Sequence, residues 1–216
     1  LTPRERLARL LDPSMPFLEI GNIAGYMLDT KVEAKSIPGS TVIAGIGFIS
    51  GVRCMVVVDD SGILAGSMTT AGGYRIRRAE QISLEQRLPF VHLVESAGGD
   101  LMNYTVEGFS AGGALFGSLA QLSKAGIPII SILHGSSTAG GAYMPGLSDY
   151  VIAIKNNGRA FLAGPPLLRA ATGEIASEEE LGGAEMHASI SGLVEYLAEN
   201  DGQGIQICRE LIDRLQ

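Results

Sequence analysis

The stretch HGSSTAGGAY, residues 134–143, decides the fold, because it places a strand, a glycine-rich turn and a helix in direct succession. The apolar, β-branched run 127–133 before it predicts a buried strand, and residues 142–147 after it can open a short helix. A strand that turns through small residues into a helix leaves backbone N–H groups that can bind a phosphate, a carboxylate or an oxyanion. The alternative is a tight turn that only allows close helix packing.

A second strand ends in the same way. The apolar run 90–94 predicts a buried strand that leads into Gly98 and Gly99, and a Gly- and Ala-rich helix over 109–124 connects it to the strand at 127–133. A strand–helix–strand unit makes its two strands parallel, so both glycine pairs should lie at the same carboxyl edge of the sheet. Open α/β folds bind their ligands at this edge.

Periodic segments surround this unit on both sides. Hydrophobic spacing predicts amphipathic helices at 2–12, 72–88 and 204–215. Capping-box spacings mark helix starts at Thr2 and Ser177, and Gly164 precedes two prolines that suit a first helical turn. Alternating or continuous β-branched runs predict antiparallel strands at 41–49, 52–58 and 63–68 and short strands at 150–155 and 160–163.

Composition narrows the class of protein. The 216 residues fit one α/β domain, 1–216, since 46% are hydrophobic, 18% are charged and 29 are glycines. The net charge of −7 argues against nucleic acid as a partner, and no apolar run is long enough to span a bilayer. Cys54 and Cys208 form no metal or redox spacing, so we expect no metal and a reducing compartment, either the cytoplasm or, in a eukaryote, the mitochondrial matrix.

Two sets of backbone donors at one sheet edge favour the stabilisation of an enolate or a tetrahedral oxyanion. The chain has three histidines, none at metal-ligand spacing from another, and His92 lies inside an apolar strand as a packed core residue would. Without an evident side-chain base, the proton acceptor must come from the substrate or a cofactor. This argues against simple hydrolysis.

Two other functions remain open at this point. A Clp-type or acyl-ester serine hydrolase would use Ser137, whose surroundings differ by one residue from a nucleophile elbow, with His187 and either Asp149 or Asp201 as partners. The third possibility is that this chain is the noncatalytic half of a larger protein and only supports oligomerisation.

The densest positive cluster lies near the start of the helix predicted at 72–88. Arg75, Arg77 and Arg78 form either a solvated face or a contact for a phosphorylated ligand, because guanidinium forks suit phosphate oxygens.

Four blocks of the sequence resemble the carboxyltransferase (beta) subunits of biotin-dependent acyl-CoA carboxylases, in that family's order. They are TAGGAY at 138–143, FLAGPPL at 161–167, AATGE at 170–174 and ELGGA at 180–184, which is followed by His187. The resemblance implies a crotonase-like (ClpP/crotonase) fold of stacked βαβ units. It also implies transfer of a carboxyl group from carboxybiotin to the α-carbon of an acyl-CoA.

The same resemblance assigns roles to residues and partners. The acyl-CoA oxyanion hole would fall on the N–H groups of Gly141 and Ala142, with Gly98 and Gly99 lining the opposite side. We also expect contacts to the CoA ester from Ala139 and Gly140, and from Arg75 and Arg78 of the arginine cluster described above. We expect this chain to be a fragment, the N-terminal, acyl-CoA-binding carboxyltransferase domain without its C-terminal domain. That C-terminal carboxyltransferase domain would complete the site in a homo-oligomer. Its partners would be biotin carboxyl carrier and biotin carboxylase subunits.

Overall fold

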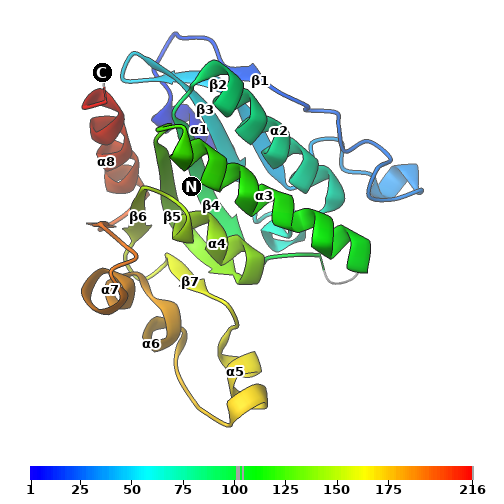
Figure 1. Cartoon of the computed structure of the whole chain (residues 1–216), viewed down its shortest axis with the longest axis vertical. Helices are drawn as coiled ribbons and strands as arrows, with labels where there is room; N and C mark the ends of the chain where they lie inside the picture. Colours follow the sequence, from blue (N-terminus) through cyan, green and yellow to red (C-terminus); the bar gives the residue numbers. More distant parts are fainter. Residues whose placement is uncertain (101–102, 104, 216) are drawn as a thin grey trace.

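A mixed sheet runs through the centre of the computed structural model, which describes residues 1–100, 103 and 105–215 (Figure 1). Within these residues the sheet has eight strands in the order β1-β2-β3-β4-β5-β6-β8, and β7 pairs with the end of β5. β1, β2 and β3 are antiparallel, whereas β3 to β8 pair in parallel. The strands are β1 Leu18–Glu19, β2 Val42–Ile49, β3 Val52–Asp59, β4 Phe90–Ser96, β5 Ile129–Thr138, β6 Tyr150–Ile154, β7 Arg159–Phe161 and β8 Tyr196–Ala198.

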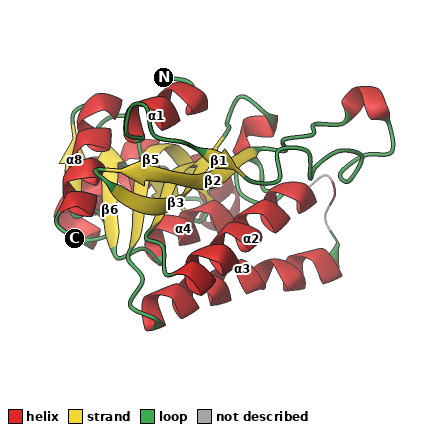
Figure 2. Cartoon of the chain, turned by 90° about the horizontal axis from the view of Figure 1, so that it is seen from above, coloured by secondary structure: helices red, strands yellow, loops and turns green. Residues whose placement is uncertain are grey.

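Helices cover both faces of the sheet (Figure 2). On one face α2 and α3 pack side by side, and on the other α1 packs against α8. Each face has its own hydrophobic core, which explains why the parallel strands read as continuous apolar runs. The helices are α1 Pro3–Leu10, α2 Thr70–Gln86, α3 Val106–Lys124, α4 Tyr143–Gly146, α5 Pro165–Thr172, α6 Glu178–Gly182, α7 Ala184–Met186 and α8 Asp201–Asp213.

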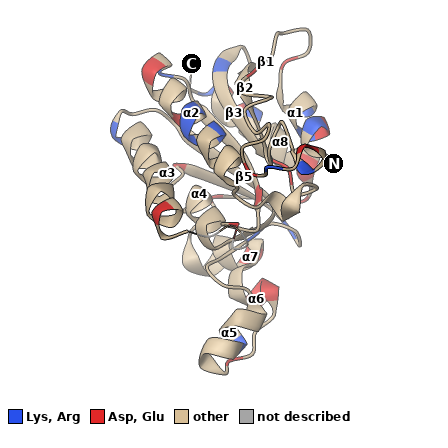
Figure 3. Cartoon of the chain, turned by 90° about the vertical axis from the view of Figure 1, so that its right-hand side faces the viewer, with Lys and Arg blue, Asp and Glu red and all other residues tan. Residues whose placement is uncertain are grey.

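Local sequence signals place most of these elements. The capping boxes at Thr2 and Ser177 start α1 and α6 as predicted, and α5 begins at Pro165 directly after its N-cap Gly164. β4 and β5 are parallel and are connected through α3, so the predicted βαβ unit is confirmed. Figure 3 shows charges only at the two ends of α3, which matches a helix rich in small and apolar residues.

The strand predicted at 63–68 is wrong. This segment forms the short 3-10 turn η2, Leu64–Gly66, because Ala65 and Gly66 adopt positive φ angles of 53° and 68° that no strand allows. Gly66 lies so close to the end of β4 that a Cβ atom would stand 2.2 Å from the Glu95 carbonyl oxygen. The strand predicted at 127–133 is also too short, since β5 continues to Thr138 and its last residues pair with β7.

Arg75 does not lie on a solvated face. Its side chain is 3% exposed, and its guanidinium donates to the carbonyl oxygens of Ile20, at 2.8 Å, and of Gly39 and Val42. These bonds attach the segment between β1 and β2 to α2. Arg75 therefore stabilises the fold, whereas Arg77 and Arg78 are exposed.

Replacing Arg75 with Met should lower the free energy of unfolding by about 3 kcal/mol, because one buried and two partly buried carbonyl groups lose charged donors. Urea unfolding measures this loss. The matched variant Arg78→Met, at an exposed position of the same helix, should change stability by no more than about 0.5 kcal/mol. A loss below about 1 kcal/mol in Arg75→Met would contradict the anchoring role.

Glu80 is a buried carboxyl group on α2, with 1% of its surface exposed. Burial raises the pKa of Glu80 to about 8, and the Ser118 hydroxyl and the charge of Arg77 offset only part of this rise. The group is therefore protonated in the folded protein at neutral pH, whereas an unfolded glutamate with its ordinary pKa of 4.5 is ionised.

Because the folded state keeps this proton between pH 4.5 and about 8, Glu80 should make stability fall as the pH rises through that window. The slope should reach about 1.4 kcal/mol per pH unit at most. Glu80→Gln, which mimics the protonated acid, should be flatter than the wild type over this range in urea unfolding at several pH values. Parallel curves for the two proteins would show that Glu80 is ionised in the fold.

Candidate active site

The glycine-rich stretch continues β5 into a helix start. β5 ends at Thr138, the 3-10 turn η4 spans Ala139–Ala142, and α4 follows directly, as the predicted helix start at 142 requires. Thr138 is the N-cap in an extended conformation, but its side chain makes no capping hydrogen bond. Because the first N–H groups of a helix have no acceptor within it, this turn presents backbone donors at the carboxyl end of β5.

Gly98 brings the loop after β4 against this turn. It adopts a φ of +86°, and a Cβ atom built on it would stand 2.7 Å from the Thr138 carbonyl oxygen. Gly99 forms an isolated bridge with Met68. The predicted meeting of the two glycine pairs at one sheet edge is therefore confirmed.

Gly141 is buried between two serines on neighbouring strands. A Cβ atom at this position would stand 3.0 Å from both the Ser137 Oγ and the Ser96 Cβ. A Cβ atom at 141 therefore requires one of these serine side chains or the turn to shift by a few tenths of an ångström, and a β-branched residue requires a larger shift. Ala142, the other predicted donor, is only half-buried.

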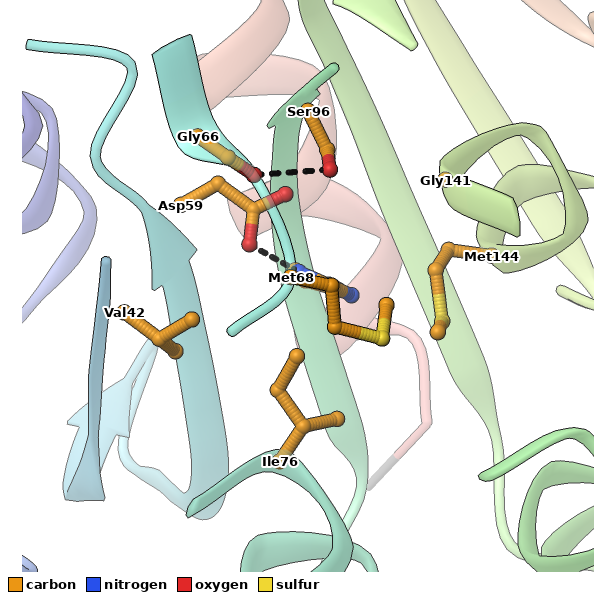
Figure 4. A pocket seen from close by; sticks show the side chains of 9 residues that line it. Val42, Asp59, Gly66, Met68, Ile76, Ser96, Gly141 and Met144 are labelled. Atoms are coloured by element: carbon orange, nitrogen blue, oxygen red, sulfur yellow. Dashed lines mark hydrogen bonds and ion pairs between the residues drawn. The ribbon is translucent and has the colours of Figure 1, made fainter. Parts of the chain in front are cut away.

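A small cavity of about 10 Å³ lies beneath Gly141, enough for roughly one water molecule. Figure 4 shows Gly141 and Met144 on one side of it and Asp59 and Gly66 on the other. His92 lines the same cavity and, as predicted, is a core residue with 2% exposure, while its Nε2 lies 3.1 Å from Asp59 Oδ1. The Asp59–His92 pair was not expected, because its members lie 33 positions apart and no motif links them.

A larger, open pocket of about 440 Å³ begins at Ala142. All of its lining residues except His187 are apolar: Ala142, Ala160, Phe161, Leu162, Ala163, Leu168, Leu181, His187 and Leu193. Six of them, Ala160 to Ala163, Leu168 and Leu181, come from the segment that holds β7, α5 and α6 and extends beyond the end of the sheet in Figure 1. An apolar group bound here would lie directly beside the glycine-rich turn.

The three predicted partners of a nucleophilic Ser137 are bound to other groups. His187 bonds to Ser191 and to the Ala160 carbonyl, both at 2.7 Å, and Asp149 accepts the Ile129 N–H at 2.9 Å. Asp201 lies 2.5 Å from His134 Nδ1.

Ser137 itself is fully buried, and its hydroxyl has no hydrogen-bond partner in the described residues. The triad that the serine hydrolase alternative requires is therefore not assembled among the described residues.

His134 belongs to a charged network on the opposite face of the sheet. Burial lowers the pKa of His134 and outweighs its hydrogen bond to Asp201. Although burial raises it, the hydrogen bond from His134 and the charge of Arg6 hold the pKa of Asp201 well below its ordinary value. His134 and Asp201 therefore bind each other on this face, and His134 does not contribute to the glycine-rich edge.

The described part of the chain holds no cluster of three or more His, Cys, Asp or Glu that could bind a metal ion. Cys54 and Cys208 are both buried free thiols. Among the helices described, none is long and apolar enough to cross a membrane.

Parallel strands that end in two facing glycine turns define an α/β protein with a glycine-rich sheet edge, where open α/β folds bind their ligands. The solved structures that resemble this chain are carboxyltransferases of the crotonase-like fold, which confirms the fold class predicted above. The family model described as carboxyl transferase domain matches residues 1–216, and the chain belongs to this family.

Similar proteins include a probable biotin-dependent acyl-coenzyme A carboxylase beta2 subunit of Mycobacterium tuberculosis, 47% identical over all of this chain and 39% of that protein. The crystal structure of the P. aeruginosa geranyl-CoA carboxylase beta subunit is 50% identical with a TM-score of 0.89, over 99% of this chain and 39% of that one. The crystal structure of transcarboxylase 12S with methylmalonyl-CoA and methylmalonic acid bound is 30% identical with a TM-score of 0.89. This match covers 98% of this chain and 41% of that one. The chain thus spans about two fifths of the length of these relatives.

Proposed function

We propose that this chain is the N-terminal, acyl-CoA-binding half of a carboxyltransferase that moves a carboxyl group from carboxybiotin to the α-carbon of an acyl-CoA. The observation that carries the proposal is the close approach of the Gly98 loop to the Gly141 turn in a member of the carboxyl transferase domain family. The named relatives that bind or act on CoA esters support the same substrate class.

In this proposal the thioester oxygen of the substrate accepts hydrogen bonds from the N–H groups of Gly141 and Ala142. When the α-proton leaves, negative charge develops on this oxygen, and each preorganised donor lowers the barrier by about 3 kcal/mol. Ala139 and Gly140 leave room for the thioester to approach the backbone. The apolar pocket beside Ala142 would receive the acyl group, and Arg78 remains the candidate for a CoA phosphate.

Of the imidazoles near this edge, His92 is buried and bonds through Nε2 to Asp59, and His187 bonds to Ser191 and Ala160. This fits a reaction whose base is not a side chain of this chain. Carboxybiotin would supply both the carboxyl group and, after its loss, the proton acceptor. We propose that a biotin carboxyl carrier and a biotin carboxylase deliver it in the cytoplasm, or in the mitochondrial matrix of a eukaryote, and that a C-terminal domain completes the site in a homo-oligomer.

Gly141→Val should abolish carboxyl transfer in the complete enzyme, by at least about 100-fold, because the side chain would displace the donor turn. Transfer of labelled carboxyl groups to acyl-CoA measures the loss, and calorimetry measures CoA ester binding. Gly146→Val is the matched control, since a Cβ atom there meets no heavy atom within 4 Å. The proposed function fails if the chain binds no CoA ester and Gly141→Val transfers carboxyl groups at the wild-type rate.

Ser137→Ala should keep carboxyl transfer within about twofold of the wild type, because its hydroxyl makes no hydrogen bond in the described residues. A fluorophosphonate probe should likewise leave Ser137 unlabelled. Labelling that disappears in Ser137→Ala would restore the serine hydrolase as the function.

A further inference from the structure

Ser96, the last residue of β4, bridges two loops with one hydroxyl group. Its Oγ–H donates to the Gly66 carbonyl oxygen at 2.8 Å, and the Gly98 N–H donates to the same Oγ at 3.2 Å. Both hydrogen bonds are buried, and Ser96 is 5% exposed. The Gly98 N–H is thereby used inside the protein, so Gly98 shapes the site without offering its own N–H to a ligand.

Three glycines from separate segments converge on this serine. A Cβ atom on Gly66 would stand 3.2 Å from the Ser96 Cα, and one on Gly141 would stand 3.0 Å from the Ser96 Cβ. Figure 4 shows the Ser96 side chain with its hydrogen bond to Gly66, above the cavity that Gly141 also lines. Ser96 therefore touches the η2 turn, the Gly98 loop and the Gly141 turn at once.

Ser137 occupies the equivalent place on the next strand and provides a comparison within the molecule. It pairs with Ser96 in the register of β4 and β5, and its Oγ lies 3.0 Å from the Cβ position of Gly141. Ser137 is as deeply buried as Ser96, yet its hydroxyl bridges nothing in the part of the chain that the structure describes. Two serines thus flank the same glycine, and one of them connects the loops.

We propose that Ser96 is a positioning residue that fixes the Gly98–Gly99 loop relative to the Gly141 turn and so sets the width of the site for the thioester carbonyl. This inference rests on the proposed function. Loss of the hydroxyl would leave the Gly66 carbonyl and the Gly98 N–H without their buried partner. Two backbone hydrogen bonds, Met68 N–H to Gly98 O at 2.7 Å and Ala97 N–H to Ala65 O at 3.1 Å, would still hold the loop on the fold.

The test compares Ser96→Ala with Ser137→Ala in the complete enzyme, assembled with its biotin-bearing partner. Carboxyl transfer to acyl-CoA gives kcat and KM, calorimetry gives the affinity for free CoA, and thermal unfolding reports the fold. We expect Ser96→Ala to lower kcat about tenfold or more, since small displacements of a positioned group have such effects. Free CoA has no thioester carbonyl, so its affinity should stay within about twofold of the wild type in both variants, and Ser137→Ala should keep the wild-type kcat.

A kcat for Ser96→Ala within about twofold of the wild type overturns the proposal, and so does an equal loss in both variants. A parallel loss of free-CoA affinity and melting temperature would show a purely structural role and also overturns it. If Ser96→Ala does not fold, Ser96→Cys and Ser137→Cys give the same comparison with a thiol that is a weaker hydrogen-bonding group. Absence of carboxyl transfer in the wild-type enzyme would instead refute the proposed function, which separates the two failures.

Discussion

The contact between the Gly98 backbone and the Thr138 carbonyl is the constraint on which the site depends. A Cβ atom on Gly98 would stand 2.7 Å from that oxygen, so the two strand ends approach as closely as backbones can. The parallel pairing of β4 and β5 brings both ends to one edge, and a small residue at each turn lets them meet. Without this approach, two glycine turns would be two separate anion sites instead of two walls of one site.

The last two residues of β4, Glu95 and Ser96, make contacts on opposite faces of the sheet. Successive side chains of a strand point to opposite faces, so Ser96 faces the Gly141 turn while Glu95 faces the other side. There Glu95 accepts a 2.6 Å hydrogen bond from Arg6 on α1, and its side chain passes directly over Gly135, where a Cβ atom would collide with it at 2.6 Å. Gly135, the first glycine of the stretch 134–143, therefore makes room for Glu95 and its hydrogen bond to α1. The later glycines, Gly140 and Gly141, lie in the turn at the candidate site.

Local sequence patterns predicted most helices and strands. Contacts between residues far apart in the sequence determine the conformation of segment 63–68 and the hydrogen bonds of Arg75 and Ser96. Caps, the βαβ unit and the shared glycine edge follow from short-range sequence signals, and the structure has them. The segment 63–68 looks like a strand because it is apolar, yet its left-handed residues and its packing against β4 turn it into η2. The guanidinium of Arg75 could bind a phosphate, but it donates instead to backbone carbonyl groups that lie 33 to 55 positions away in the sequence. The hydrogen bond of Ser96 to Gly66 spans 30 positions, and no spacing rule could have suggested it.

The three histidines all form hydrogen bonds inside the fold, which fits the proposal that backbone groups carry the chemistry at this edge. Every histidine of the chain is buried and bonded to another group, His92 to Asp59, His134 to Asp201 and His187 to Ser191. Each of these bonds fixes the orientation of one imidazole inside the protein. In the proposed function the turn at Gly141 instead presents peptide dipoles, which cannot change protonation state and need no reorganisation when charge develops on a bound oxygen. We propose that an edge built in this way would stabilise an anion at constant geometry and leave proton transfer to the molecules that bind there, as the proposed carboxyl transfer between two bound substrates requires.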